Sequence, residues 1–103
     1  MDQAPQAPGP SLSIELSEEV AEGVYSNLVM IAHSPEEFIL DFIRVMPGVP
    51  KARVKSRIVV TPAHAKRLLA ALAENLQRYE AQHGDIGDVV PQQPVFTRPA
   101  GEA

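Results

Sequence analysis

Apolar and polar residues alternate at several places along the chain, and this period of two is typical of β-strands with one solvent-facing side. Leu12, Ile14 and Leu16 are separated by polar residues, which predicts a first strand over 12–16. Residues 24–33 (VYSNLVMIAH) are rich in strand formers and predict a second strand, which ends before a Ser-Pro pair. The acidic segment between these two strands predicts a connecting turn, or one turn of helix.

Two further strands are predicted in the middle of the chain. Residues 38–45 (FILDFIRV) are almost continuously apolar, which fits a strand covered on both faces or a short buried helix. The run lies between two prolines and is short, which favours the strand. After a Pro-Gly-Val-Pro turn, residues 52–60 alternate strictly and predict a fourth strand, with Arg53, Lys55 and Arg57 on one face.

A long helix is predicted to follow the last strand. The threonine hydroxyl of Thr61 can accept from amides of the first helical turn, and Pro62 at the first helical position loses no hydrogen bond. Apolar residues then recur at spacings of four and three and form one stripe: Ala65, Leu69, Leu72, Leu76 and Tyr79, widened by Leu68. His83 and Gly84 suit the end of the helix, so the helix is expected between Thr61 and Gly84.

This order of elements predicts an α+β fold, a four-stranded antiparallel meander followed by one long C-terminal helix packed on the sheet. One helix covers one sheet face, whereas the strand over 38–45 has two apolar faces, so a second subunit is expected to cover the other. We expect Leu69, Leu72 and Leu76 to face the sheet. The candidate core or interface residues are Phe38, Leu40, Phe42, Ile43, Leu69, Leu72, Leu76 and Tyr79.

The length of 103 residues fits one domain, and prolines suggest its limits. They are dense near both ends of the chain, which predicts a disordered leader over 1–11 and a disordered Pro-rich tail over 87–103. The single domain is therefore expected over 12–86. A body of this size buries only about 60% of its unfolded surface, which again favours self-association into a homodimer or higher oligomer.

Composition excludes several kinds of site. The absence of cysteine excludes disulfides, thiolate zinc sites, iron–sulfur clusters and cysteine nucleophiles. No apolar run is long enough to span a membrane, and the first eleven residues lack the features of a secretory signal, so a cytoplasmic protein is expected. No known catalytic, nucleotide-binding or metal-binding motif occurs, and we expect no enzyme activity, cofactor or metal site.

Two groups of residues could in principle carry chemistry. Of the three histidines, His33 is expected at a strand end, His64 in the first helical turn and His83 about five turns further on, so the two helix histidines cannot converge on a metal ion within one chain. The neighbouring carboxylates at residues 18–19 and 36–37 point apart in turns, and solubility explains them better than acid–base catalysis.

The most distinctive feature is a basic segment in an acidic protein, whose net charge is −4. Residues 1–50 hold eight acidic side chains against Arg44 alone, whereas 51–67 hold six basic ones and no acid. Alternate strand residues lie about 6.8 Å apart, close to the phosphate spacing of a nucleic acid strand. The candidate binding residues are Lys51, Arg53, Lys55 and Arg57.

Three roles are open for this basic strand. It can pair with Glu36, Glu37 and Asp41 on the neighbouring strand, bind an acidic protein partner, or bind a nucleic acid backbone. No aromatic residue alternates with the basic ones as stacking platforms do, and the whole chain is acidic, so nucleic acid is the less favoured partner.

Three groups of residues together form a family pattern: Tyr25, Ser26, Asn27, Phe38, Asp41 and Phe42; then Val54, Arg57, Ile58, Pro62, Ala65, Lys66 and Leu68; then Leu76, Tyr79, Glu80, Gly84 and Ile86. With these residues, the chain resembles a bacterial family of short proteins of unknown function, DUF3467, over about residues 12–86. The resemblance implies no activity, cofactor or catalytic residue.

Together these observations predict a non-catalytic, homo-oligomeric binding or adaptor domain. Nucleic-acid binding through residues 51–57 is one alternative. A second alternative is a chaperone or holdase, because four antiparallel strands followed by a long helix resemble the layout of the export chaperone SecB. The low aromatic content, 5%, weakens that likeness.

Overall fold

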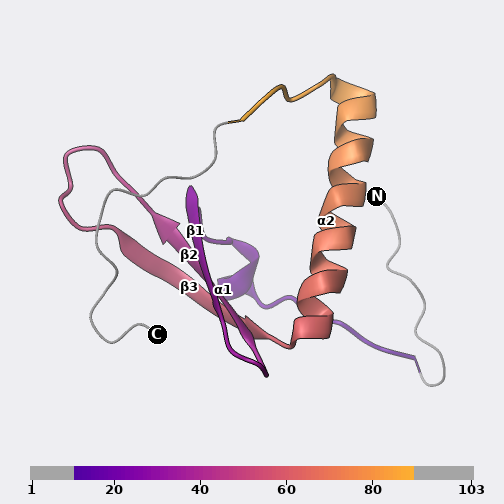
Figure 1. The fold of residues 1–103 in the computed structure, drawn as a ribbon, viewed down its shortest axis with the longest axis horizontal. Coiled ribbons are helices and arrows are strands. Elements are labelled where there is room, and N and C mark those ends of the chain that lie inside the picture. Colours follow the sequence, from indigo (N-terminus) through magenta and orange to yellow (C-terminus); the bar gives the residue numbers. More distant parts are fainter. Residues whose placement is uncertain (1–10, 90–103) are drawn as a thin grey trace.

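The computed structural model describes residues 11–89, which form three strands and two helices. Their order is α1 (Glu18–Ala21), β1 (Leu28–His33), β2 (Phe38–Arg44), β3 (Arg53–Val60) and α2 (Pro62–His83). The strands make one antiparallel sheet in the order β1-β2-β3 (Figure 1). The α+β class is as predicted. The predicted leader and tail lie outside the described residues, apart from residue 11 and residues 87–89.

The prediction of a first strand over 12–16, which would give the sheet four strands, is wrong. These residues pair with no strand in the described part of the chain, and Leu12, Ile14 and Leu16 are exposed. Alternation tells which side of a strand would face a core, but pairing also needs a neighbouring edge with free amides and carbonyls. The turn predicted after this segment is α1, where the Ser17 hydroxyl accepts from the Val20 amide.

The three other strands form where the alternation predicts them. β1 begins later than expected, at Leu28, and β2 and β3 match the prediction to within one residue at each end. The Pro-Gly-Val-Pro turn joins β2 to β3, and the Val49 amide donates to the Met46 carbonyl at 3.2 Å. Gly48 is the third residue of the turn that this hydrogen bond closes, a position that requires a positive φ, and its φ is 78°. A residue with a side chain would be strained in this left-handed conformation, which glycine adopts freely.

Local signals define both ends of α2. At its start, Thr61 Oγ1 accepts from the His64 amide at 3.1 Å, with Pro62 as the first helical residue. At its end, Gly84 has φ 94° and donates to the Glu80 carbonyl. The predicted helix is confirmed from end to end. Within residues 11–89, no helix combines the length and apolarity needed to cross a bilayer.

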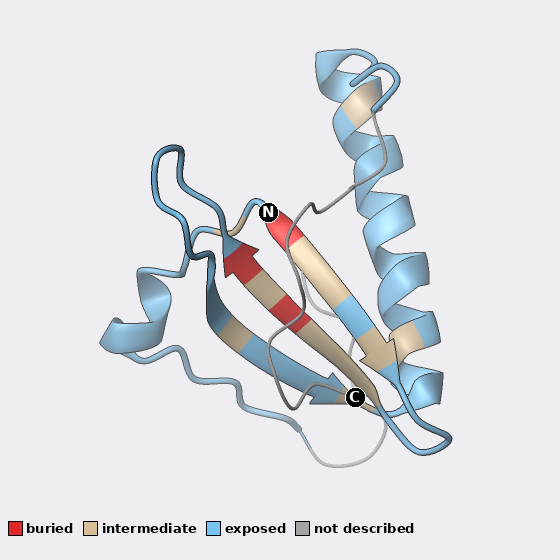
Figure 2. Cartoon of the chain, turned by 60° about the vertical axis from the view of Figure 1, so that its left-hand side comes forward, coloured by how far each residue is buried: buried red, intermediate tan, exposed pale blue. Residues whose placement is uncertain are grey.

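The prediction that α2 packs on the sheet is wrong. The helix stands beside the sheet (Figures 1 and 2), and Leu69, Leu72 and Leu76 are 67%, 55% and 44% exposed. Thr61 alone separates β3 from α2, which is shorter than the two to six residues that usually join such elements. So short a joint leaves the chain little room to turn the helix back across a sheet face.

The hydrophobic core of the described residues is very small. Only two large apolar side chains, Leu28 and Ile43, are buried (Figure 2). Phe38, Leu40 and Phe42 on the central strand are half-buried. The central strand therefore retains apolar surface that this single copy does not cover.

Candidate interaction surfaces

The strand register assigns each residue of the sheet to one of two faces. Directly opposed residues of antiparallel strands share a face. The Asp41 face, so called here, holds Leu28, Met30 and Ala32 of β1, Ile39, Asp41 and Ile43 of β2, and Val54, Arg57 and Val59 of β3. The opposite Phe42 face holds Val29 and Ile31, then Phe38, Leu40, Phe42 and Arg44, then Arg53, Ser56, Ile58 and Val60.

One ion pair lies at the centre of the Asp41 face. Arg57 donates to both carboxylate oxygens of Asp41, from Nε at 2.7 Å and from Nη2 at 2.8 Å. The Asp41 side chain is 10% exposed, whereas that of Arg57 is 45% exposed. Such two-bond contacts are among the strongest charged pairs in proteins. The pair joins β2 to β3 next to buried Ile43.

This contact also sets the titration of Asp41. The hydrogen bonds that Arg57 donates lower the pKa of Asp41 below its usual value, burial opposes the shift, and the positive charge of Arg57 adds to it. The carboxylate is therefore ionised throughout the neutral range. The predicted cross-strand pairing of the basic segment with Asp41 is confirmed for Arg57. Glu36 and Glu37 lie instead in the turn between β1 and β2, at the far end of the sheet.

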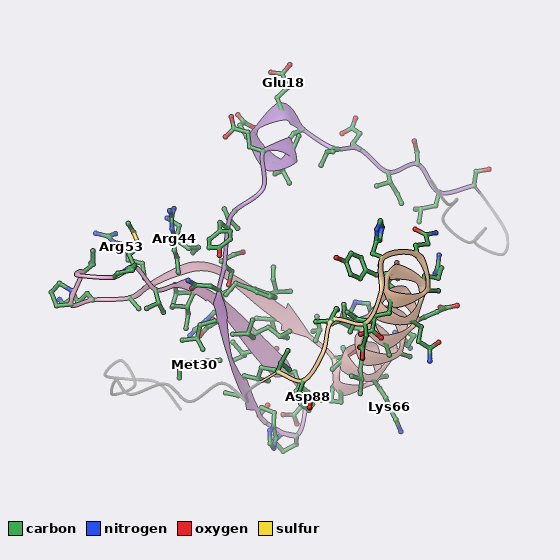
Figure 3. The ribbon with its side chains drawn as sticks, turned by 90° about the horizontal axis from the view of Figure 1, so that it is seen from above. Glu18, Met30, Arg44, Arg53, Lys66 and Asp88 are labelled. Atoms are coloured by element: carbon green, nitrogen blue, oxygen red, sulfur yellow. The ribbon has the colours of Figure 1, made fainter. Side chains whose placement is uncertain are left out.

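The prediction that Arg53, Lys55 and Arg57 share one face is wrong. The register shifts between Phe42 and Ile43, where β3 holds one extra residue. Arg57 is opposite Asp41, but beyond the bulge Arg53 is opposite Arg44 on the Phe42 face. Figure 3 shows Arg44 and Arg53 pointing to one side of the sheet and Met30 to the other. Strict alternation in one strand cannot reveal a bulge, because the extra residue is defined only by the partner strand.

The bulge gathers positive charge at one end of the sheet. We call the exposed residues Arg44, Lys51, Arg53 and Lys55 the basic hairpin. No acidic residue occurs in the sequence from Phe42 to Ser56. The Arg44 guanidinium lies 5.7 Å from the centre of the Tyr25 ring, a cation–π contact. Arg44 is the residue of this group that the basic-strand analysis missed, because it belongs to β2.

The residues before β1 hold the base of the basic hairpin in place. The Asn27 side chain donates to the Val45 carbonyl at 3.0 Å and accepts from the Val45 amide at 2.8 Å, as a strand backbone would. The backbone N–H of Asn27 and the hydroxyl of Ser26 both donate to the Ile43 carbonyl, each at 3.0 Å. These contacts give a structural role to the Tyr-Ser-Asn motif, whose role could not be derived from the sequence alone.

The second surface is the apolar stripe of α2, which we define as Ala65, Leu68, Leu69, Leu72, Leu76 and Tyr79. Ala65 is half-buried and the five larger residues are exposed, from Leu68 at 41% to Leu69 at 67%. The expectation that Leu69, Leu72 and Leu76 face the sheet is therefore wrong for this copy. Single exposed leucines are common on protein surfaces, whereas these residues form a contiguous stripe along one side of the helix.

The three histidines lie in different elements or at different ends of one element. His33 stacks on Phe38 with ring centres 5.2 Å apart, and His83 lies 4.7 Å from the Tyr79 ring at the end of α2. His64 lies in the first turn of that helix. Among residues 11–89, no three histidine, cysteine or carboxylate side chains gather in a way that could hold a metal ion.

Comparison with protein families places the chain. Residues 1–88 match the family model described as protein of unknown function (DUF3467). The chain belongs to this family. The family description carries no activity, so the surfaces above are the basis for a functional proposal. No curated protein and no solved structure matches the chain.

Proposed function

We propose that this chain is a non-catalytic, homo-oligomeric binding or adaptor domain. The supporting observation is that, within residues 11–89, only Leu28 and Ile43 are buried large apolar side chains, while the apolar stripe of α2 and part of the Phe42 face remain exposed. Burial of apolar surface is the dominant favourable term in both folding and association. A second copy carries the same uncovered surfaces, and most soluble oligomers are symmetric assemblies of one chain.

The basic hairpin supports the binding part of the proposal. Arg44 and Arg53 are directly opposed on one sheet face, and like charges in this position are destabilising. An anionic partner would relieve this repulsion while contacting side chains that are already exposed. We therefore propose an acidic protein segment, with carboxylates that accept from these guanidinium groups, as the partner.

Nucleic acid is the second candidate for the same surface, because phosphates are also anions that arginine binds well. Two observations make it less favoured. Arg57 is engaged by Asp41, and the bulge interrupts the row of basic residues that would follow a phosphate backbone. The Tyr25 ring lies against the Arg44 guanidinium, and no aromatic residue alternates with the basic residues of β3 as a stacking platform would.

Sedimentation velocity at micromolar concentration tests the assembly. The expected result is a dimer or higher oligomer that dissociates on dilution. A folded monomer at these concentrations contradicts the proposal, because such a monomer would be stable with its apolar stripe exposed.

Fluorescence anisotropy tests the binding surface. A labelled glutamate-rich peptide and a labelled single-stranded oligonucleotide of equal charge are titrated with the protein at low salt. We expect peptide binding that weakens as salt is added, and a Kd that rises roughly fivefold or more in Arg53→Glu. The matched control is Arg67→Glu, the same charge change on α2, which should leave the Kd within about twofold.

Three other results of the anisotropy titrations would change or overturn the proposed binding surface. Tighter binding of the oligonucleotide, lost in Arg53→Glu, would replace the acidic protein with nucleic acid as the partner. An equal effect of Arg53→Glu and Arg67→Glu would show that net charge, and not the basic hairpin, governs binding. If neither probe binds, the binding half of the proposal is wrong.

A further inference from the structure

Most of the apolar stripe of α2, extended by His83, has the repeat of a helix-pairing seam. Successive seam residues are separated by four, three, four, three and four positions: Ala65, Leu69, Leu72, Leu76, Tyr79 and His83. This is the heptad spacing that keeps one line of side chains facing a partner helix. The helix has 22 residues and is about 33 Å long, so the seam spans nearly its full length. Within the described residues, none of these six side chains is buried.

The order of side chains in the seam suits antiparallel pairing with an identical helix. With a two-fold axis between Leu72 and Leu76, Leu72 meets Leu76 of the partner subunit, and Leu69 meets Tyr79 of the partner subunit. The small residue Ala65 then meets the larger His83 of the partner subunit. Each pairing occurs twice by symmetry, so large apolar side chains meet near the axis and the small Ala65 is opposed to a larger residue at each end.

The charges beside the seam distinguish the two directions of pairing. One flank of the seam carries Lys66, Ala73 and Glu80 at intervals of seven. In an antiparallel pair these flanks meet, so Lys66 lies beside Glu80 of the partner subunit at both ends, and Ala73 meets its own copy at the axis. In a parallel pair each flank meets the other side of the partner helix, where Lys66 would lie near Thr61 and Glu80 near Asn75, without an opposite charge.

The other flank of the seam is also compatible with the antiparallel direction. It carries Leu68, Asn75 and Gln82, none of them charged. Asn75 meets its own copy and Leu68 meets Gln82 of the partner subunit, so no like charges are opposed.

On the first flank, the Lys66 side chain extends away from the helix into solvent (Figure 3), where it can reach a second chain.

We infer that α2 pairs with α2 of a second copy in antiparallel orientation, about a two-fold axis between Leu72 and Leu76. This inference rests on the proposed homo-oligomeric function and names the surface through which two copies join. The sheet and the basic hairpin then lie outside the helix pair and remain available to a partner. Antiparallel pairing also places the two sheets at opposite ends of the paired helices.

Cross-linking tests the orientation, because the chain has no cysteine and each introduced thiol is unique. Ala73→Cys and Asn75→Cys each place a thiol near the axis and should link to their own copies with a short bis-maleimide. Lys66→Cys alone should not, because its two thiols would be about 24 Å apart along the pair. An equal mixture of Lys66→Cys and Glu80→Cys should link. Gln77→Cys, on the outer side of the helix, is the matched control and should stay unlinked.

A charge exchange provides a second, independent measurement. Lys66→Glu and Glu80→Lys should each raise the dimer Kd roughly tenfold, since each change opposes like charges at both ends of the pair. The double variant should return the Kd to within about threefold of the original. Arg67→Glu, on the outer side of α2, should change it by less than about twofold. Because Glu80 also accepts from the backbone amide of Ile86, circular dichroism is recorded for each variant to check that α2 remains helical.

The outcomes separate this inference from the proposed function. Linking of Lys66→Cys to itself shows a parallel pair and overturns the inference. Unlinked Ala73→Cys and Asn75→Cys in a protein that still sediments as an oligomer overturn the inference alone. A monomer in sedimentation overturns both.

Discussion

The sheet and helix α2 are held together by different kinds of interaction. The sheet joins residues distant in sequence, through its ladders, the Asp41–Arg57 ion pair and the contacts of Asn27 with Val45. Helix α2 is defined almost entirely by residues close in sequence, with Thr61 at one end and Gly84 at the other, and its apolar stripe is exposed.

The comparison shows where this chain is self-sufficient and where it depends on a partner. Isolated helices gain most of their stability from packing of an apolar face, not from propensity or caps. In one copy, α2 lacks that packing, whereas the sheet has at least Leu28 and Ile43 buried. Changes in the sheet should therefore act on folding, and changes in the stripe of α2 should act on assembly.

The largest effect is expected from the most buried side chain. Ile43, 3% exposed, lies on the central strand, and Ile43→Ala should lower the free energy of unfolding by about 2–4 kcal/mol. The control is Val59→Ala on the same sheet face, half exposed, with an expected loss below about 1 kcal/mol. Urea unfolding followed by circular dichroism measures both. Equal losses would mean that the sheet has no distinct core.

The next effect is expected from the ion pair between β2 and β3. Asp41→Asn removes a buried carboxylate from Arg57 and should cost about 1–3 kcal/mol at neutral pH, less than a fully buried pair because Arg57 remains half exposed. Glu37→Gln, an exposed carboxylate in the β1–β2 turn, should change stability by less than about 0.5 kcal/mol. Matching losses in the same unfolding assay would exclude a special role for Asp41.

The same residue predicts a dependence on pH. The pKa of Asp41 is lower in the folded protein than its usual value of 3.8, so its ionised form stabilises the fold above that pH. As the pH falls below about 4, the unfolded state binds a proton first and this contribution is lost. The stability difference between the wild type and Asp41→Asn should therefore shrink steadily as acid is added. A difference that stays constant down to pH 3 would contradict the lowered pKa.

The smallest effect is expected at the start of α2. Thr61→Ala removes the hydroxyl that accepts from the His64 amide and should cost about 1 kcal/mol. Thr61→Ser keeps a capping hydroxyl and should cost only a few tenths. Helical signal in circular dichroism, recorded on heating, separates the two variants. An unchanged melting curve for Thr61→Ala would show that α2 is held by contacts other than its local cap.

The accuracy of prediction from sequence followed the range of the interactions. The helix over 62–83 is predictable because its apolar spacing lies within the segment and its cap and terminal glycine lie directly beside it. The prediction of a strand at 12–16 fails because its partner edge would have to come from elsewhere in the chain. The prediction that the basic residues share one face fails because the bulge at Lys55 is defined only relative to β2.

Local patterns in the chain are sufficient to predict the α+β class, the three strands and their turns, the helix with both its ends, and the basic segment, because each depends on neighbouring residues. The three-dimensional structure was needed to show that Arg57 pairs with Asp41, that Arg53 is opposed to Arg44, and that α2 stands beside the sheet with its apolar stripe exposed. The two pairings depend on strand register, which is a relation between two strands. The place of α2 depends on the direction in which the chain leaves β3 through the single residue Thr61, which residue periodicity does not record.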